Sequence, residues 1–427
     1  MATNIPYGSP IANKLQSAGL FAANMQRNTT LNRLAGKFPQ QAQAESTIRQ
    51  QTSTNMPIVR CMDLQKMAGD EVEFDFINHL GGKPIMGSRN AEGYGRPMSF
   101  AQDRLRINQA RYPISAGDTM TQQRTPHELR KLGRTLGEAY MNRLQDQLSL
   151  VHMAGARGFH TAPDWAVPLA SDPDFAEIMV NTVRAPSRNR HLMSTGTGLE
   201  RVAAAGNEIS LATTDVFNAD LVDALSSHLD SMSLPPPFVE FDGDKQAYDA
   251  PLRVLLCSAE QYNGFTQSPG YRTYLSNAIA RGQQMGNHPL FAGGNSALWN
   301  GILLVKMPKP IRFYAGNPIN WCASTSSETE TTTDLVPASF GTTHAVDRAI
   351  LLGGQALAEA WGKHRKTGNP FFWSEKELDH DDKLELLVGA INGRSKVRFE
   401  VDHGGEKQIT DHGIIAIDTV VKLGVAG

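Results

Sequence analysis

Residues Thr125 to Gly155, TPHELRKLGRTLGEAYMNRLQDQLSLVHMAG, carry the clearest helix pattern in this chain of 427 residues. The first four have the form of a capping box, in which Thr125 accepts from a free amide and Glu128 reaches back. Gly155 is a typical helix stop. We therefore predict a spine helix over 126–154, about 45 Å long at roughly 1.5 Å per residue. Its buried face would be the apolar row Leu129, Leu132, Leu136, Tyr140, Leu144, Leu148 and Val151.

Two consequences of this helix can be tested. A charge placed at Leu136, within the predicted buried row, should prevent folding, because an unpaired buried charge is strongly unfavourable. Gly133 and Gly137 indicate a close approach to another element, more often a sheet than a second helix in a soluble protein. A helix of this length favours a structural role.

A hairpin is predicted upstream of the helix. Val72, Phe74 and Phe76 alternate with acidic residues, which is typical of a half-buried strand. A second strand should run from Arg104 to Ile114, with a bulge near Gln109 where the apolar residues change parity. The acids of the first strand would then face Arg104 and Arg106 across the hairpin.

The connection between these strands, residues 81–102, is rich in glycine and contains two prolines. A loop this long without structure of its own is unusual in a compact domain, so it is either disordered or a finger that orders on another molecule. The uncovered apolar residues Tyr94, Met98 and Phe100 favour the finger. We expect contacts between subunits from Lys83, Arg89, Tyr94, Arg96, Met98 and Phe100.

Downstream of the spine, residues 156–213 show no regular pattern. An α/β unit is predicted over 214–350, and strands are expected near the C-terminus. The predicted elements are a helix over 217–232, strands at 252–257 and 302–306, an exposed loop at 324–334, a helix over 349–361, and strands at 397–401 and 414–421.

Composition limits the possible classes. Residues 1–60 carry a local charge of +5 within a chain of net charge −2, which suggests either contact with an anionic partner or a solvated tail. The arm 1–56 has weak periodicity, and we expect it to be extended or disordered until it meets a partner. Three distant cysteines, Cys61, Cys257 and Cys322, indicate reduced thiols. No secretion signal or membrane-spanning run is evident.

No catalytic motif stands out. The chain lacks a phosphate-binding loop, a nucleophile elbow and an HExxH zinc motif. Asp379-His380-Asp381-Asp382, with His403 or His412, is the best candidate for a metal site, but a solvated or interface-facing charged patch is the favoured interpretation. Sequence-reading nucleic-acid motifs are absent, whereas non-specific phosphate contact by the basic arm is compatible with the composition.

Several stretches occur in an order that resembles the major capsid protein family of tailed bacteriophages, of the podovirus type that infects enterobacteria. The stretches are Gly117–Thr125, Asn287–Phe291, Trp299–Ile302, Ala349–Leu357, Phe371–Arg398 and His412–Thr419.

This resemblance implies an α+β, HK-ninety-seven-like fold. Residues 1–56 would be the N-terminal arm, 57–75 and 118–213 the peripheral domain with its spine helix, and 76–117 the extended hairpin loop. Residues 214–350 would form the axial domain, and 351–427 would return to the peripheral domain.

The implied function is self-assembly into hexamers and pentamers of an icosahedral head enclosing double-stranded DNA. The protein would not be an enzyme and would need no cofactor or metal. Its partners would be other copies of itself, scaffold, portal and cement proteins, and DNA, with no membrane. It would reside in the virion after assembly in the host bacterial cytoplasm.

Two alternatives from other classes remain open on the sequence. One is a non-viral, shell-forming compartment protein of the same fold. The other is a metal-dependent enzyme built around Asp379–Asp382.

Overall fold

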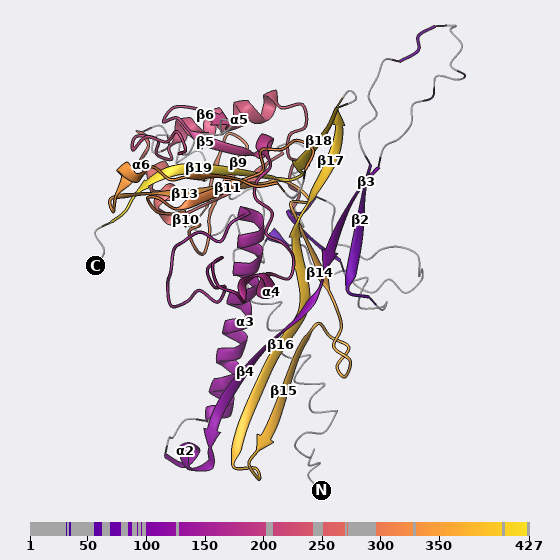
Figure 1. Ribbon diagram of the computed structural model, residues 1–427, viewed down its shortest axis with the longest axis vertical. Coiled ribbons are helices and arrows are strands. Elements are labelled where there is room, and N and C mark those ends of the chain that lie inside the picture. Colours follow the sequence, from indigo (N-terminus) through magenta and orange to yellow (C-terminus); the bar gives the residue numbers. More distant parts are fainter. Residues whose placement is uncertain are drawn as a thin grey trace.

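The structure is a computed structural model of the chain. It describes residues 31, 34–35, 55–61, 69–77, 84–87, 92, 95, 100–124, 128–201, 208–241, 251–269, 271, 296–327, 330–403 and 406–424. Figure 1 shows a broad upper part built on one sheet and a narrow lower part, in which a long helix lies along a second sheet.

The narrow part contains a five-stranded sheet centred on the longest strand, β16 (Lys383–Lys396). One side of β16 pairs with β15 (Phe371–Leu378) and β14 (Leu357–Trp361), and β14 pairs in parallel with β1 (Ile58–Cys61). The other side of β16 pairs with β4 (Asn108–Asp118), which the short helix α2 (Thr119–Arg124) follows. Residues 108–117, which we predicted as part of the extended loop, therefore lie in this sheet.

The broad part contains an eight-stranded sheet whose central strands are buried on both faces. Its strands run in the order β6 (Leu199–Arg201), β5 (His191–Ser194), β19 (Ile414–Lys422), β13 (His344–Leu352), β7 (Arg253–Cys257), β9 (Ile302–Lys306) and β8 (Ser296–Trp299), and β10 (Arg312–Phe313) pairs with β13. Strands β5 and β19 come from segments that we assigned to the peripheral domain. The eight-stranded sheet therefore also contains strands from outside residues 214–350.

Two helices cover one face of the larger sheet. Helix α5 (Ala219–Ser231) begins after Asn218, whose side chain accepts from the Leu221 amide, and buries the predicted Leu221, Leu225 and Leu229. Helix α6 (Ala259–Gln267) has a capping box formed by Ser258 and Gln261. The predicted helix at 217–232 and the strands at 252–257, 302–306 and 414–421 are therefore confirmed.

The helix predicted over 349–361 is wrong. These residues form the end of β13, a turn, and β14, and nearly all of them are buried. A strand that is covered on both faces has no alternation, so its apolar residues can imitate helical spacing. The loop predicted at 324–334 is also partly wrong, because it runs into β12 (Thr332–Leu335), where buried Asp334 accepts from the Trp321 indole.

Smaller elements complete the fold. The hairpin of β2 (Glu71–Ile77) and β3 (Phe100–Arg106) is confirmed, with Glu71 opposite Arg106 and Glu73 opposite Arg104. The predicted strand 104–114 is instead two strands, because β3 pairs with β2 whereas β4 pairs with β16. The others are α4 (Phe175–Met179), the 3-10 helices η3 (Arg188–Arg190) and η4 (Ala338–Phe340), and the pairs β11 (Pro318–Trp321) with β12 and β17 (Arg398–His403) with β18 (Glu406–Asp411).

Part of the predicted arm belongs to the subunit's own core. Leu31 and Leu34 are fully buried beside Met56 and Ile58, and Ala35 bridges to Ile58. The expectation that the arm 1–56 is extended or disordered until it meets a partner is wrong at these positions. The rest of the segment up to residue 54 lies outside the described residues.

Candidate assembly surfaces

The spine helix is α3 (Leu129–Ala154), which begins later than predicted and ends as predicted at Gly155 in a left-handed conformation. Glu128 precedes the helix with an extended backbone and makes no capping bond through its side chain. A capping box needs its glutamate inside the first turn, so the predicted box is wrong. Thr125, Pro126 and His127 lie outside the described residues.

The buried face of α3 also differs from the prediction. In the first half of the helix, Leu132 is 46% exposed and Leu136 is 66% exposed, whereas Gly133 and Gly137 are buried. The predicted row is buried only further along, at Leu144, Leu148 and Val151. The expectation that a charge at Leu136 would prevent folding is therefore not supported by this position's environment.

Gly133 and Gly137 explain why the first half of α3 turns a different side toward the sheet than predicted. A β-carbon at Gly133 would lie 2.6 Å from Leu386 Cδ1, and one at Gly137 would lie 2.7 Å from Val388 Cγ2. The backbone of α3 thus approaches β16 closely, as expected for glycines packed against a sheet. Because the glycine side faces the sheet, the leucines on the adjoining side of the helix are left in solvent.

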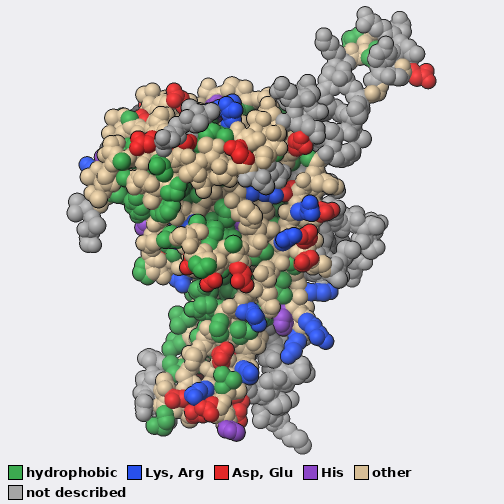
Figure 2. Space-filling view, in the orientation of Figure 1, with side chains coloured by type: hydrophobic (Ala, Val, Ile, Leu, Met, Phe, Trp, Pro, Cys, Tyr) green, Lys and Arg blue, Asp and Glu red, His purple; other side chains and the backbone are tan. Residues whose placement is uncertain are grey.

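Leu132 and Leu136, together with Tyr112 on β4, form an exposed apolar stripe, which we call the spine stripe. Tyr112 is 40% exposed and stacks on Tyr140 of α3, with ring centroids 3.9 Å apart. Figure 2 shows hydrophobic side chains on this face of the narrow part, over α3 and β4. Large apolar residues grouped on a surface commonly mark a protein–protein contact.

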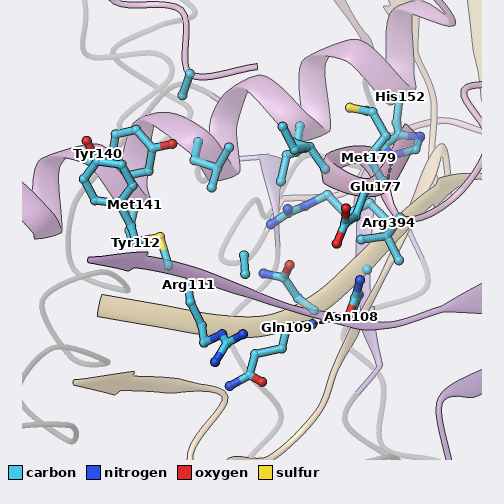
Figure 3. Close-up of a pocket in the computed structure, with 18 residues that line it drawn as sticks. Asn108, Gln109, Arg111, Tyr112, Tyr140, Met141, His152, Glu177, Met179 and Arg394 are labelled. Atoms are coloured by element: carbon cyan, nitrogen blue, oxygen red, sulfur yellow. Dashed lines mark hydrogen bonds between the residues drawn. The ribbon is translucent and has the colours of Figure 1, made fainter. Parts of the chain in front are cut away.

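A groove of about 370 Å³ adjoins the spine stripe between α3, β4, β16 and the segment around α4. Figure 3 shows the Tyr112–Tyr140 pair at one end and His152, Met179 and Arg394 at the other. Met141, Leu144 and Leu148 line its helical wall. The helical wall of the groove is therefore apolar, whereas Asn108, Gln109 and Arg111 of β4 contribute polar groups on the strand side.

The polar end of the groove is held in place by buried hydrogen bonds. Arg394 donates to Glu359 at 2.7 Å, and Glu359 also accepts from Arg60 at 3.2 Å. Burial lowers the pKa of His152 to about 3, although its ring contacts the Met179 carbonyl at 3.2 Å. His152 is therefore neutral at physiological pH, and this end of the groove is fixed by the fold.

The rim of the groove is strained at Val180. Its φ of 64° is rare for a β-branched residue, because the side chain crowds the backbone in that region. The next residue, Asn181, holds this segment to the sheets, since its side chain donates to the carbonyls of Arg106 and Arg394.

The strand beside the groove has an unpaired edge. Within the described residues, β4 pairs only with β16, so its other edge has no strand partner. Such an edge can accept a strand from another chain. Pro113 within β4 agrees with this position, since proline is tolerated in edge strands.

Further buried ion pairs join the end of β16 to the β17–β18 pair. Asp411 accepts from Lys396 at 2.8 Å and from Arg398 at 2.7 Å. Burial alone would raise the pKa of Asp411, but the two cations hold it well below its usual range. Burial lowers the pKa of Lys396 to about 8.

A second cluster joins α3 to the larger sheet. Arg348 of β13 donates to Asp418 of β19 at 2.7 Å and to the carbonyl of Ala154 at the end of α3. His191 of β5 lies 2.6 Å from the other oxygen of Asp418. Sequence reasoning missed the clusters around Glu359, Asp411 and Asp418. The available signal was charged residues inside otherwise apolar runs, such as Arg348, Glu359 and Asp418.

Most of the predicted contact residues cannot be placed. Lys83, Arg89, Tyr94, Arg96 and Met98 lie outside the described residues, and Phe100 is the first residue of β3, opposite Ile77. Ile85 and Met86, which are described, are exposed, Met86 by 72%. The cysteines Cys61, Cys257 and Cys322 are all buried.

The acidic stretch Asp379–Asp382 forms the turn between β15 and β16, where Asp379 pairs with Lys383 at 2.7 Å. Across the described part of the chain, no group of three His, Cys, Asp or Glu side chains is arranged to hold a metal ion. None of the helices there is both long and apolar enough to cross a membrane.

Comparison with known proteins identifies the family. A family model described as phage capsid protein matches residues 4–423. No curated protein matches the chain.

Among solved structures, the capsid of Ralstonia phage GP4 is similar with a TM-score of 0.67 and 24% identity, covering 100% of both chains. The capsid of cyanophage Pam1 has a TM-score of 0.56 and 14% identity, covering 89% of this chain and 98% of that one. The capsid of Helicobacter pylori bacteriophage KHP30 has a TM-score of 0.52 and 10% identity, covering 99% and 100%.

These likenesses confirm the α+β, HK-ninety-seven-like fold. The family also contradicts the metal-dependent enzyme considered above. With the family model spanning nearly the whole sequence, the chain belongs to the phage capsid protein family and is a major capsid protein, a structural component of a bacteriophage head.

Proposed function

We propose that this major capsid protein builds an icosahedral head of hexamers and pentamers by burying the spine stripe and the adjoining groove against neighbouring copies. The observation that carries the proposal is the exposure of Leu136 beside Leu132 and Tyr112, on a helix that otherwise packs closely on its sheet. Fully burying each such side chain contributes about 1.5–3 kcal/mol. A single subunit leaves this contribution unrealised.

The finger is the proposed element that reaches a neighbour. Met86 is exposed in the first part of this segment, and the hairpin at its base, β2–β3, is anchored on the subunit through Val72 and Leu105. We keep Lys83, Arg89, Tyr94, Arg96, Met98 and Phe100 as proposed contacts. The free edge of β4 offers backbone partners to an extended segment, and the groove between β4 and α3 offers it an apolar helical wall.

Each contact of this kind is weak, but closed symmetry repeats it around every capsomer, so that the contacts reinforce one another. In the proposed division of labour, the five-stranded sheet with α3 is the core of the peripheral domain, and the eight-stranded sheet is the core of the axial domain. Scaffold, portal and cement proteins, the packaged double-stranded DNA and assembly in the host bacterial cytoplasm belong to the same proposal.

The test is a charge on the spine stripe. Leu136→Glu should leave a folded subunit, because the side chain points into solvent, but should abolish shells, tubes and capsomers in negative-stain electron microscopy. Thr135→Glu is the matched control, since it adds the same charge at the next exposed position of the helix. Circular dichroism and sedimentation would establish folding for both variants.

Assembly of Leu136→Glu as efficiently as the wild type would show that the spine stripe is not an interface. Loss of folding in Leu136→Glu alone would show that the side chain is covered within the subunit. Either result would reject the proposed surface.

A further inference from the structure

The connection between β14 and β15, residues 362–370 with the sequence GKHRKTGNP, holds a dense group of cations. Lys363, Arg365 and Lys366 are exposed, whereas Thr367 is buried. We call this segment the basic loop. Figure 2 shows Lys and Arg side chains and a histidine close together on the flank of the narrow part, where this connection leaves the sheet in Figure 1.

The basic loop is held in one conformation. The His364 ring stacks on Phe372 of β15, with centroids 4.3 Å apart and an angle of 14° between the planes. The His364 amide donates to the Asn369 carbonyl at 2.9 Å, and the Gly368 amide donates to the His364 carbonyl at 2.8 Å. A loop closed by its own backbone bonds presents its cations with little further loss of conformational entropy on binding.

The three cations of the basic loop differ from the buried cations nearby. Arg60, Arg394 and Lys396 of the five-stranded sheet and Arg398 of β17 are buried and paired with carboxylates. In contrast, no carboxylate among the described residues lies within ion-pair distance of Lys363, Arg365 or Lys366. Burial and the charge of Lys366 lower the pKa of His364, so the histidine adds no charge near neutral pH.

We infer that the basic loop is a contact for the phosphate groups of double-stranded DNA. This inference rests on the proposed function, because a shell that encloses DNA brings phosphates to its inner surface. The exposed side chains of the loop are cationic, with no apolar residue among them to anchor a protein partner. Such a surface recognises a regular row of phosphates and carries no information about base sequence.

The contact would be weak in one subunit and strong in the assembly. Each cation that neutralises a phosphate releases condensed counterions and steepens the salt dependence of binding by about 0.9 in the slope of log K against log salt concentration. Three contacts would contribute about 2 to 3 to that slope. Repetition of the loop across the shell would multiply its effect.

The experiment compares a loop variant, Lys363→Gln/Arg365→Gln/Lys366→Gln, with a control, Lys131→Gln/Lys376→Gln/Lys422→Gln. The control removes the same charge from three exposed lysines that are scattered over the described surface. Fluorescence anisotropy of a labelled 30-base-pair duplex would be measured with each full-length protein as the unassembled subunit, isolated by sedimentation, between about 50 and 200 mM salt. Electron microscopy of assembled preparations would report shell formation separately.

The loop variant should bind the duplex at least tenfold more weakly than the control at 50 mM salt, and its salt slope should fall by about 2 to 3. Shells should form in wild type, control and loop variant alike. Equal affinities and slopes for the two variants, or no binding by the wild type, would overturn the inference.

The assembly measurement distinguishes a failure of this inference from a failure of the proposed function. If only the loop variant fails to form shells, the basic loop contacts another copy of the chain, and the assignment to DNA is wrong. If the wild type forms no shells but the predicted loss of DNA binding is seen, the inference about the loop stands and the proposed assembly fails.

Discussion

The two halves of α3 bury their surfaces in different ways. From Met141 to Ala154 the helix lies between the sheets, and nearly every residue is buried, including Leu148 and Val151. From Leu129 to Tyr140 the helix packs against β4 and β16 of the five-stranded sheet, and within this half only Gly133 and Gly137 are buried. The same apolar spacing therefore forms core in one half and exposed surface in the other.

The difference shows that an apolar stripe in a shell protein can be covered either by its own subunit or by a neighbouring one. The second half is covered by the subunit, because the larger sheet meets its end through Leu150, Met153 and Ala154. The first half has no second layer among the described residues. We expect other subunits to supply that layer.

The largest effect expected from this comparison is on stability. Leu150→Ala should lower the free energy of unfolding by about 2–5 kcal/mol, because it opens a cavity at a fully buried site. Leu136→Ala, the same change in the exposed half, should alter it by less than about 1 kcal/mol. Urea unfolding of the unassembled subunit measures both. Similar losses at the two sites would contradict the comparison.

The second effect is on the pH dependence of stability. The pKa of His152 in the buried half is about 3 in the folded protein and about 6.5 when unfolded, so the unfolded state binds the proton first. Its contribution to stability is complete above about pH 6.5 and is lost as pH falls toward 3.

Between pH 7 and pH 5 this residue should account for a loss of about 2 kcal/mol. His152→Gln, which keeps a donor for the Met179 carbonyl, should remove that part of the pH dependence, whereas Leu136→Ala should retain it. Urea titrations at the two pH values would decide. If His152→Gln loses as much unfolding free energy between pH 7 and pH 5 as the wild type, other groups cause the acid sensitivity.

The smallest effect is at the glycine contact. Gly137→Ala gains about 1 kcal/mol of helix propensity but places a β-carbon 2.7 Å from Val388 Cγ2 and 3.0 Å from Ile114 Cδ1. Overpacking of this kind costs typically 1–3 kcal/mol, so a net loss of about 1 kcal/mol is expected. Thermal unfolding beside Thr135→Ala, at an exposed site, tests it. A more stable Gly137→Ala would mean that α3 does not approach β16 so closely.

Much of the fold could be predicted from local sequence patterns. The β2–β3 hairpin and its opposed charges follow from alternation over a few residues, and α5 follows from the spacing of Leu221, Leu225 and Leu229. The end of α3 at Gly155 follows from the backbone freedom of glycine. These features depend on neighbours in the sequence.

The errors have a common origin in long-range contacts. The segment 349–361 was predicted as a helix because its two strands are covered on both faces and lose their alternation. The basic loop was overlooked because a short run of cations has no distinctive pattern until its neighbours are known to lack acids. The buried carboxylates Glu359 and Asp418 pair with cations that are distant in the sequence, Arg60 and Arg348. Asp411 pairs with the nearer Arg398.

By itself, the sequence determined that a long amphipathic helix exists, where it ends, and that its surroundings resemble phage capsid proteins. Only the tertiary structure decided which side of the helix faces the sheet. Spacing identifies apolar residues, but burial depends on which elements come close, and Gly133 and Gly137 allow β16 to come closer than any side with a larger residue would. That contact turns Leu132 and Leu136 from predicted core into the exposed surface that we propose as an interface.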